Sequence, residues 1–106
     1  MSMLTLNADD QTGRQLRTVL ELTVNNHPGV MSHLSGLFAR RAFNIDGILC
    51  MPIGDGRKSR IWLRVHEDQR LDQMIKRMMK LEDVHDVQNH GAHHEIFAQL
   101  EPFFRT

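Results

Sequence analysis

The alternation of apolar and polar positions is clearest over residues 18–25. Apolar residues at every second position predict a strand with one buried face, and they are Leu20, Leu22 and Val24. From Val30 the apolar positions recur at i, i+4, i+7 and i+8, which predicts a helix from Pro28 to about Ala42. Pro28 is expected in the first turn of this helix, because a proline there loses no intrahelical hydrogen bond.

The second half of the chain continues with two strands, a helix and a strand. Residues 44–54 are rich in isoleucine, leucine and methionine, and residues 60–66 alternate after a glycine-rich turn, so together they predict a hairpin. Apolar residues at helical spacing over 71–81 predict a second helix, and residues 84–89 predict a last short strand.

The predicted order is β, α, β, β, α, β, with a crossover helix between two strands in each half. Right-handed crossovers place both helices on one face of a four-stranded antiparallel sheet, which is the ferredoxin-like α+β sandwich. The other face is uncovered, and we expect Trp62 and the stem of Arg64 to lie on it. Small domains commonly bury such a face in a partner.

Composition sets further limits. The 106 residues suit one domain, and 13 Lys plus Arg balance 13 Asp plus Glu, so no overall positive field would attract nucleic acid. No stretch approaches the roughly 18 apolar residues of a membrane span. The single cysteine, Cys50, cannot form an intramolecular disulfide and is expected to be a small core residue. These features predict a cytoplasmic protein without a nucleic-acid or membrane partner.

The two ends of the chain differ from this periodic body. Residues 1–16 hold no persistent period and are expected to form a flexible tail, which leaves one domain over 17–90. Residues 91–106 form an extension with a possible short helix, which Pro102 limits. Several apolar residues there are costly to leave in water, and they are expected to pack on the sheet, a partner or a second copy: Ile96, Phe97, Leu100, Phe103 and Phe104.

The turn between the first strand and the first helix is the candidate site. Unpaired N–H groups and the positive end of the helix dipole attract a carboxylate, and Gly29 lets a ligand approach the backbone closely. Asn25 and Asn26 precede the helix, and each side chain offers a donor and an acceptor, as a zwitterion requires. Asn44 begins the next strand, at the opposite end of the sheet. Its side chain can therefore meet the turn only across a two-fold dimer.

The run LELTVNNHPGVMSHLSGLFARRAFNIDGILCMPI, residues 20–53, resembles the signature of ACT domains, which bind amino acids. The N-x-PG-V turn, the helix end GLFARRAFNI, the hairpin DGRKSRIWL and the second helix DQRLDQMIKRMMKLEDV are most similar to the small regulatory subunit of acetohydroxyacid synthase, also called acetolactate synthase. The similarity covers residues 17–88. The short chain and its ending IFAQLEPFFRT most resemble the valine-sensitive isozyme I type.

This resemblance implies a regulatory subunit that binds and activates the catalytic subunit. It also implies feedback inhibition by a branched-chain amino acid, chiefly L-valine, held between two ACT domains of a homodimer. The residues that match the family's ligand contacts are Asn26, Gly29, Val30 and Asn44. Asn25 is a further candidate for ligand contact. The apolar side chain of valine would need a pocket, for which the candidates are Met31, Ile45 and Ile48. The dipeptide His27-Pro28 departs from the acidic or serine residues usual in longer subunits.

No cofactor is expected in this chain. In the family, thiamine diphosphate, Mg²⁺ and FAD belong to the catalytic subunit, and the sequence holds no G-x-G-x-x-G after a strand and no Walker loop. We therefore expect a subunit without catalysis. One cluster of residues could in principle bind a metal, but a solvated polar linker is the favoured interpretation. The cluster consists of His90, His93, His94 and Glu95.

Three alternatives remain. A stand-alone ACT-type sensor for another enzyme would bind the same kind of ligand. A single-stranded RNA-binding module needs stacking aromatics on the open sheet face, where only Trp62 qualifies. A small enzyme needs titratable groups that converge in a pocket, and His27, His33 and His66 are not expected to do so.

Overall fold

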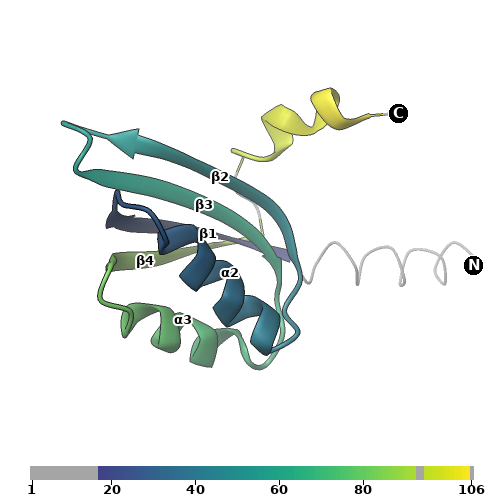
Figure 1. Cartoon of the computed structure of the whole chain (residues 1–106). Coiled ribbons are helices and arrows are strands. Elements are labelled where there is room, and N and C mark those ends of the chain that lie inside the picture. The colour runs from purple at the N-terminus through teal and green to yellow at the C-terminus, as the bar shows by residue number, and fades with distance from the viewer. Residues whose placement is uncertain (1–16, 93–94, 106) are drawn as a thin grey trace, which may run out of the picture.

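The computed structural model describes residues 17–92 and 95–105, so the predicted tail over residues 1–16 lies outside it. Within these ranges, four strands form one antiparallel sheet in the order β2-β3-β1-β4, and two α-helices cover one face of it (Figure 1). The predicted ferredoxin-like α+β fold is confirmed. The elements are β1 (Arg17–Asn25), α2 (Val30–Arg40), β2 (Ile45–Ile53), β3 (Lys58–His66), α3 (Leu71–Met79), β4 (Val84–Gly91) and the 3-10 helix η1 (Ala98–Phe104).

Helix α2 begins later than its apolar spacing predicted. Gly29 precedes the helix with φ 95°, a left-handed conformation that a helical residue cannot adopt, and Pro28 lies in the turn before it. The N–H of His33 donates to the carbonyl of Gly29 at 2.9 Å. Placing Pro28 in the first helical turn was therefore wrong, because the fixed φ of proline suits a turn as well as a helix start.

The alternating residues of β1 and β3 form the core, as their period predicted. Leu20, Leu22 and Val24 lie on the helix-covered face of β1 and are fully buried. On the same face α2 contributes Phe38, whose ring meets Phe43 edge-on at a centroid distance of 5.8 Å. Full burial of one such side chain is worth about 1.5 to 3 kcal/mol, so this layer holds α2 against the sheet.

Strand β2 is an edge strand and is less buried than its composition predicted. Cys50 pairs with the buried residue Ile61, yet Cys50 itself is exposed, so its expected place in the core was wrong. The physical reason is that an edge strand has a neighbour on one side only. Ile48 and Met51 are also exposed, at 42% and 69%. This edge therefore presents apolar side chains and unpaired backbone groups to solvent.

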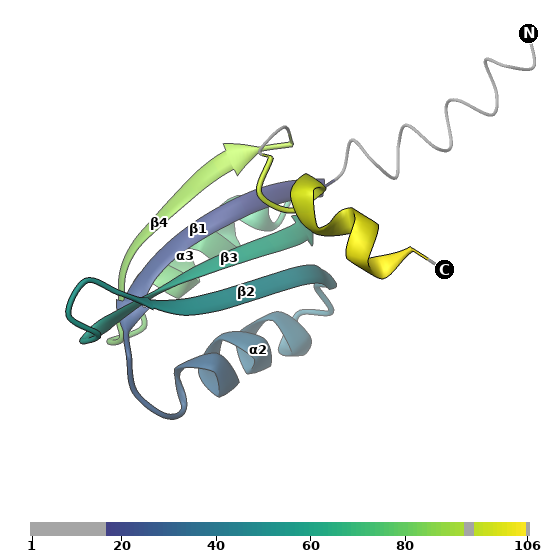
Figure 2. The same cartoon turned by 90° about the horizontal axis from the view of Figure 1, so that it is seen from above.

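The C-terminal segment lies on the sheet face opposite the α-helices (Figures 1 and 2). Phe97 packs on Gly47, where an added Cβ would lie 2.7 Å from the Phe97 ring, and the Arg64 guanidinium lies 5.6 Å from the ring centroid. Phe103 and Phe104 remain about four-fifths exposed, at 81% and 79%. The first part of the segment thus packs on the chain's own sheet. No helix within the described ranges combines the length and apolarity that crossing a membrane requires.

Candidate ligand-binding site

The sheet register fixes where the two halves of the predicted site lie. Asn25 pairs with Lys58, which pairs with Ile53, so the turn after β1 and the end of β2 lie at the same end of the sheet, with β3 between them. Ile45 pairs with Val65, which puts the start of β2, and Asn44 before it, at the opposite end. Eight residue steps of about 3.3 Å separate the two ends by roughly 26 Å. The turn and Asn44 of one chain therefore cannot contact the same small molecule.

The start of α2 offers backbone donors that the chain does not use for capping. Among the described residues, no side chain caps this helix, and its first turn holds no acidic residue. An added Cβ at Gly29 would meet nothing within 4 Å, so the approach to the backbone is open. Val30 is buried in the core, whereas the next two residues, Met31 and Ser32, are half-buried and exposed.

The asparagine side chains are held in place by bonds within the chain. Asn26 Nδ2 donates to the carbonyl of Gly56 at 2.8 Å, and Asn44 Nδ2 donates to Asp46 Oδ1 at 2.7 Å. Each of these bonds uses the amide nitrogen, and the carbonyl oxygen can still accept. Asn25 differs, because Nδ2 donates to Asp83 and Oδ1 lies 2.6 Å from His85 Nε2. Both polar ends of Asn25 are thus engaged in the protein itself.

The apolar candidates do not form one pocket within a single chain. Met31 lies in the first turn of α2 and is half-buried against the core. Ile45 lies at the far end of the sheet, and Ile48 is exposed on the edge strand between the two ends. A pocket that combines these side chains would need the edge of a second molecule.

A polar network that the sequence did not reveal surrounds the turn. His27 Nδ1 lies 2.7 Å from the carbonyl oxygen of Pro28, and Nε2 lies 2.6 Å from Asp83 Oδ1. The Pro28 carbonyl, followed by Asp83, raises the pKa of His27 above its usual 6.5. The bond from Asn25, followed by that from His27, lowers the pKa of Asp83.

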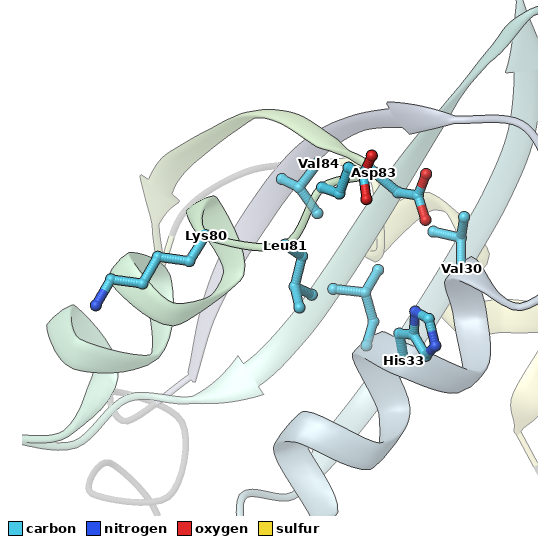
Figure 3. Close-up of a pocket in the computed structure, with 8 residues that line it drawn as sticks. Val30, His33, Lys80, Leu81, Asp83 and Val84 are labelled. Carbon is cyan, nitrogen blue, oxygen red and sulfur yellow. The ribbon is translucent and has the colours of Figure 1, made fainter.

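His33 approaches the same carboxylate from α2. It lines a cleft of about 230 Å³ together with Asp83 (Figure 3), and its proximity is a further, smaller cause that lowers the pKa of Asp83. His27 does not line this cleft, so the three histidines His27, His33 and His66 do not converge in one pocket, as predicted. His66 lies at the other end of the sheet, 3.2 Å from Asp46.

Metal ligation is not indicated by the described part of the chain. No group of three or more histidine, cysteine, aspartate or glutamate side chains there could hold an ion. His93 and His94, from the linker weighed as a metal site, lie outside the described residues.

A family model described as "AHAS small subunit-like ACT domain" matches residues 20–86, across both the turn and the hairpin. The chain belongs to the ACT-domain family of acetohydroxyacid synthase small subunits. A relative in this family, the acetolactate synthase isozyme 1 small subunit of Escherichia coli K12, is 59% identical over 87 residues, which are 82% of this chain and 91% of the relative. The resemblance to the small subunit is thereby confirmed.

Longer small subunits match over part of their length. The acetolactate synthase small subunit of Haemophilus influenzae is 37% identical over 86 residues, which are 80% of this chain and 53% of that protein. Among solved structures, the acetolactate synthase small subunit of Thermotoga maritima has a TM-score of 0.61 at 32% identity, covering 69% of this chain and 46% of that one. An ACT domain from a Chlorobium tepidum GTP pyrophosphokinase, at 16% identity and a TM-score of 0.59 over 70% of this chain and 96% of its own, supports the fold alone.

Proposed function

We propose that this chain is a cytoplasmic regulatory subunit that binds and activates the catalytic subunit of acetolactate synthase and confers feedback inhibition by L-valine. Membership of the small-subunit family supports the partner, because the similar proteins are named as small subunits of that synthase. The observation that carries the effector site is the open start of α2, with its left-handed Gly29 and no acid in the first turn. Thiamine diphosphate, Mg²⁺ and FAD are assigned to the catalytic subunit.

The effector site is proposed to form between two copies of the chain. Strand β2 is an exposed edge, and unpaired edges are ready templates for another strand. Antiparallel pairing of two β2 strands about a two-fold axis brings the start of one strand beside the end of the other. Asn44 of the partner subunit would then lie near the turn that holds Asn26. This pairing would also cover Ile48 and Met51, which are exposed in the single chain.

In this arrangement each charged group of valine has a counterpart. The carboxylate accepts bonds from the N–H groups at the start of α2, which also carry the positive end of the helix dipole. The ammonium donates to the side-chain carbonyl oxygens of Asn26 and of Asn44 of the partner subunit, since each asparagine already uses its nitrogen elsewhere. Met31 and, from the partner subunit, Ile45 would enclose the apolar side chain.

Inhibition follows if valine binds one arrangement of the two subunits better than another. A ligand between two chains can change their relative orientation and so the surface that meets the catalytic subunit. Coupling between two such sites typically amounts to about 1 to 3 kcal/mol. The effector therefore needs no contact with the reacting groups of the synthase.

The partner and the effector can be tested in one reconstitution. The chain is co-purified with an acetolactate synthase catalytic subunit, and activity is measured with and without valine, leucine and isoleucine. We expect the chain to raise activity and valine to lower it again. Asn26→Ala should relieve inhibition and leave activation intact. Loss of activation together with inhibition would assign the turn a structural role. If the two chains do not form a complex, the proposed partner is wrong.

The chain alone gives a second test. Valine at one hundred times its dissociation constant should stabilise the fold by about 2.7 kcal/mol and raise the melting temperature accordingly. No shift with any branched-chain amino acid would contradict the effector assignment.

A further inference from the structure

Both ring nitrogens of His27 face oxygen acceptors, the Pro28 carbonyl at 2.7 Å and Asp83 Oδ1 at 2.6 Å. Neutral imidazole carries one N–H, so it can donate only one of these two hydrogen bonds, whereas imidazolium donates both. The pair of contacts therefore selects the protonated ring. With one proton lost, one nitrogen would present a lone pair to an oxygen at hydrogen-bond distance.

These contacts tie the turn to the segment before β4. The Pro28 carbonyl belongs to the residue next to Gly29, and Asp83 also accepts from Asn25 Nδ2 at 3.1 Å, while its own carbonyl accepts from the N–H of Asn25 at 2.8 Å. We name the chain of contacts from Pro28 through His27 and Asp83 to Asn25 the His27 brace. It fixes both sides of the turn that leads into α2.

Other charges around the brace come from four parts of the chain. Glu82 adds negative charge beside His27, and the titratable ring of His33 on α2 lies near Asp83. His85 on β4 meets Asn25. The hairpin tip, which holds the Asp55–Arg57 ion pair, reaches the turn through the bond from the Asn26 N–H to the Arg57 carbonyl. No side-chain bond from these groups to the backbone of the turn is seen among the described residues, whereas His27 bonds the Pro28 carbonyl through its ring.

We propose that the His27 brace makes effector binding depend on protonation, with the turn binding valine more tightly when His27 is charged. The proposal rests on the function assigned above. Protonation closes both contacts and adds a positive charge next to the N–H groups that receive the carboxylate. His27 and Asp83 act here as positioning residues, since neither needs to touch the ligand.

The sign of the pH dependence follows from the contacts. The Pro28 carbonyl and Asp83 raise the pKa of His27 above 6.5, so the ring stays charged somewhat beyond that pH and loses its proton as the pH rises further. Valine affinity is highest at low pH and falls as His27 deprotonates. By linkage, bound valine raises the pKa of His27 in turn.

Calorimetric titration of valine at pH 6 and pH 8 tests the proposal. Wild type should bind about fivefold more weakly at pH 8, at the low end of usual coupling between two sites. His27→Gln should bind with equal affinity at both pH values, and Asp83→Asn should move the loss of affinity to lower pH. His90→Gln, which changes a histidine paired with Glu21 on the outer sheet face, is the matched control and should keep the wild-type profile.

Nuclear magnetic resonance of the free protein tests the His27 brace independently of whether the turn binds valine. Without valine, the amides of Gly29 and Val30 should titrate with the same midpoint as the His27 ring. The brace would be overturned, without affecting the valine assignment, if the amide shifts did not follow the His27 titration. The same holds if the His27→Gln variant kept the wild-type pH dependence of valine affinity. Coupled amides in a protein that binds no valine at any pH would support the link from His27 to the turn and overturn the effector function.

Discussion

Helix α2 begins at a left-handed glycine with no acid in its first turn, whereas helix α3 begins beside two aspartates of its own chain. Asp68 Oδ1 accepts from the N–H of Arg70 at 2.7 Å, and the carbonyl of Asp68 accepts from the N–H of Leu71 at 3.1 Å. Asp72 then follows in the first turn of α3. Both helices are crossovers in the same fold and neither has a side-chain cap bond, yet only α3 has an acidic residue in its first turn.

This difference indicates which helix start is available to an external anion. A helix N-terminus carries about half a positive charge, which nearby carboxylates neutralise. The Arg70 side chain lowers the pKa of Asp68, so the carboxylate beside α3 stays ionised well into acid. Because the first turn of α2 holds no carboxylate, we expect its start to attract an anionic ligand more strongly than the start of α3 does.

The largest effect is expected from an acid placed at the open start of α2. Gly29→Asp should weaken valine binding roughly hundredfold, because like charges placed together cost several kcal/mol and about 1.4 kcal/mol is a factor of ten. Gly29→Ala carries the left-handed strain without the charge and should lose much less affinity. Calorimetry on both variants separates the two causes. Equal losses would show that conformation, and not charge, governs the site.

A subtler change makes α2 resemble α3. Ser32 is exposed in the first turn of α2, so Ser32→Asp supplies the acid that α3 already has. We expect about 0.3 to 1 kcal/mol of added stability from the helix dipole, measured by urea unfolding, together with weaker valine binding, by roughly tenfold. Ser32→Asn is the neutral control for both measurements. A variant that gains stability and keeps full affinity would contradict the proposed anion site.

The smallest effect is expected at α3. Asp68→Asn should lower stability by about 0.5 kcal/mol, because the contacts of Asp68 with Arg70 are exposed and partly screened, and should leave valine affinity unchanged. The folded pKa of Asp68 lies below its usual 3.8, so its contribution is present above 3.8 and is lost as the pH falls through the folded value. Urea unfolding of wild type and variant should therefore converge in strong acid. A change in valine affinity would mean that α3 also takes part in the site.

The fold could be predicted because side-chain periods fix which face each element buries. Leu20 and Leu22 show this, since alternate residues of a strand must point to one side of the sheet. The exposure of Cys50 could not be predicted from the same rule, because its parity is that of a buried residue and only its place on the edge strand exposes it. The true start of α2 also depended on the backbone conformation of Gly29, which apolar spacing does not encode.

The candidate site also has one part that could be predicted from the sequence and one part that could not. The turn with Asn26 and Gly29 could be proposed from sequence, because glycine and asparagine before an apolar helical pattern indicate a helix start. The bond between His27 and Asp83 could not, because the two residues are 56 positions apart. Their meeting depends on the pairing of β1 with β4, whose register shifts between Thr23 and Val24. Such an irregularity moves every later contact and leaves no clear mark in the sequence.

The most direct test of the central claim follows backbone amides while valine is added to the isotopically labelled wild-type protein. We predict large shifts for the N–H groups of Val30, Met31 and Ser32, which would receive the carboxylate, and small shifts for Leu71 and Asp72 at the start of α3. Saturating valine that leaves the α2 amides unmoved, or that shifts both helix starts alike, would contradict the claim.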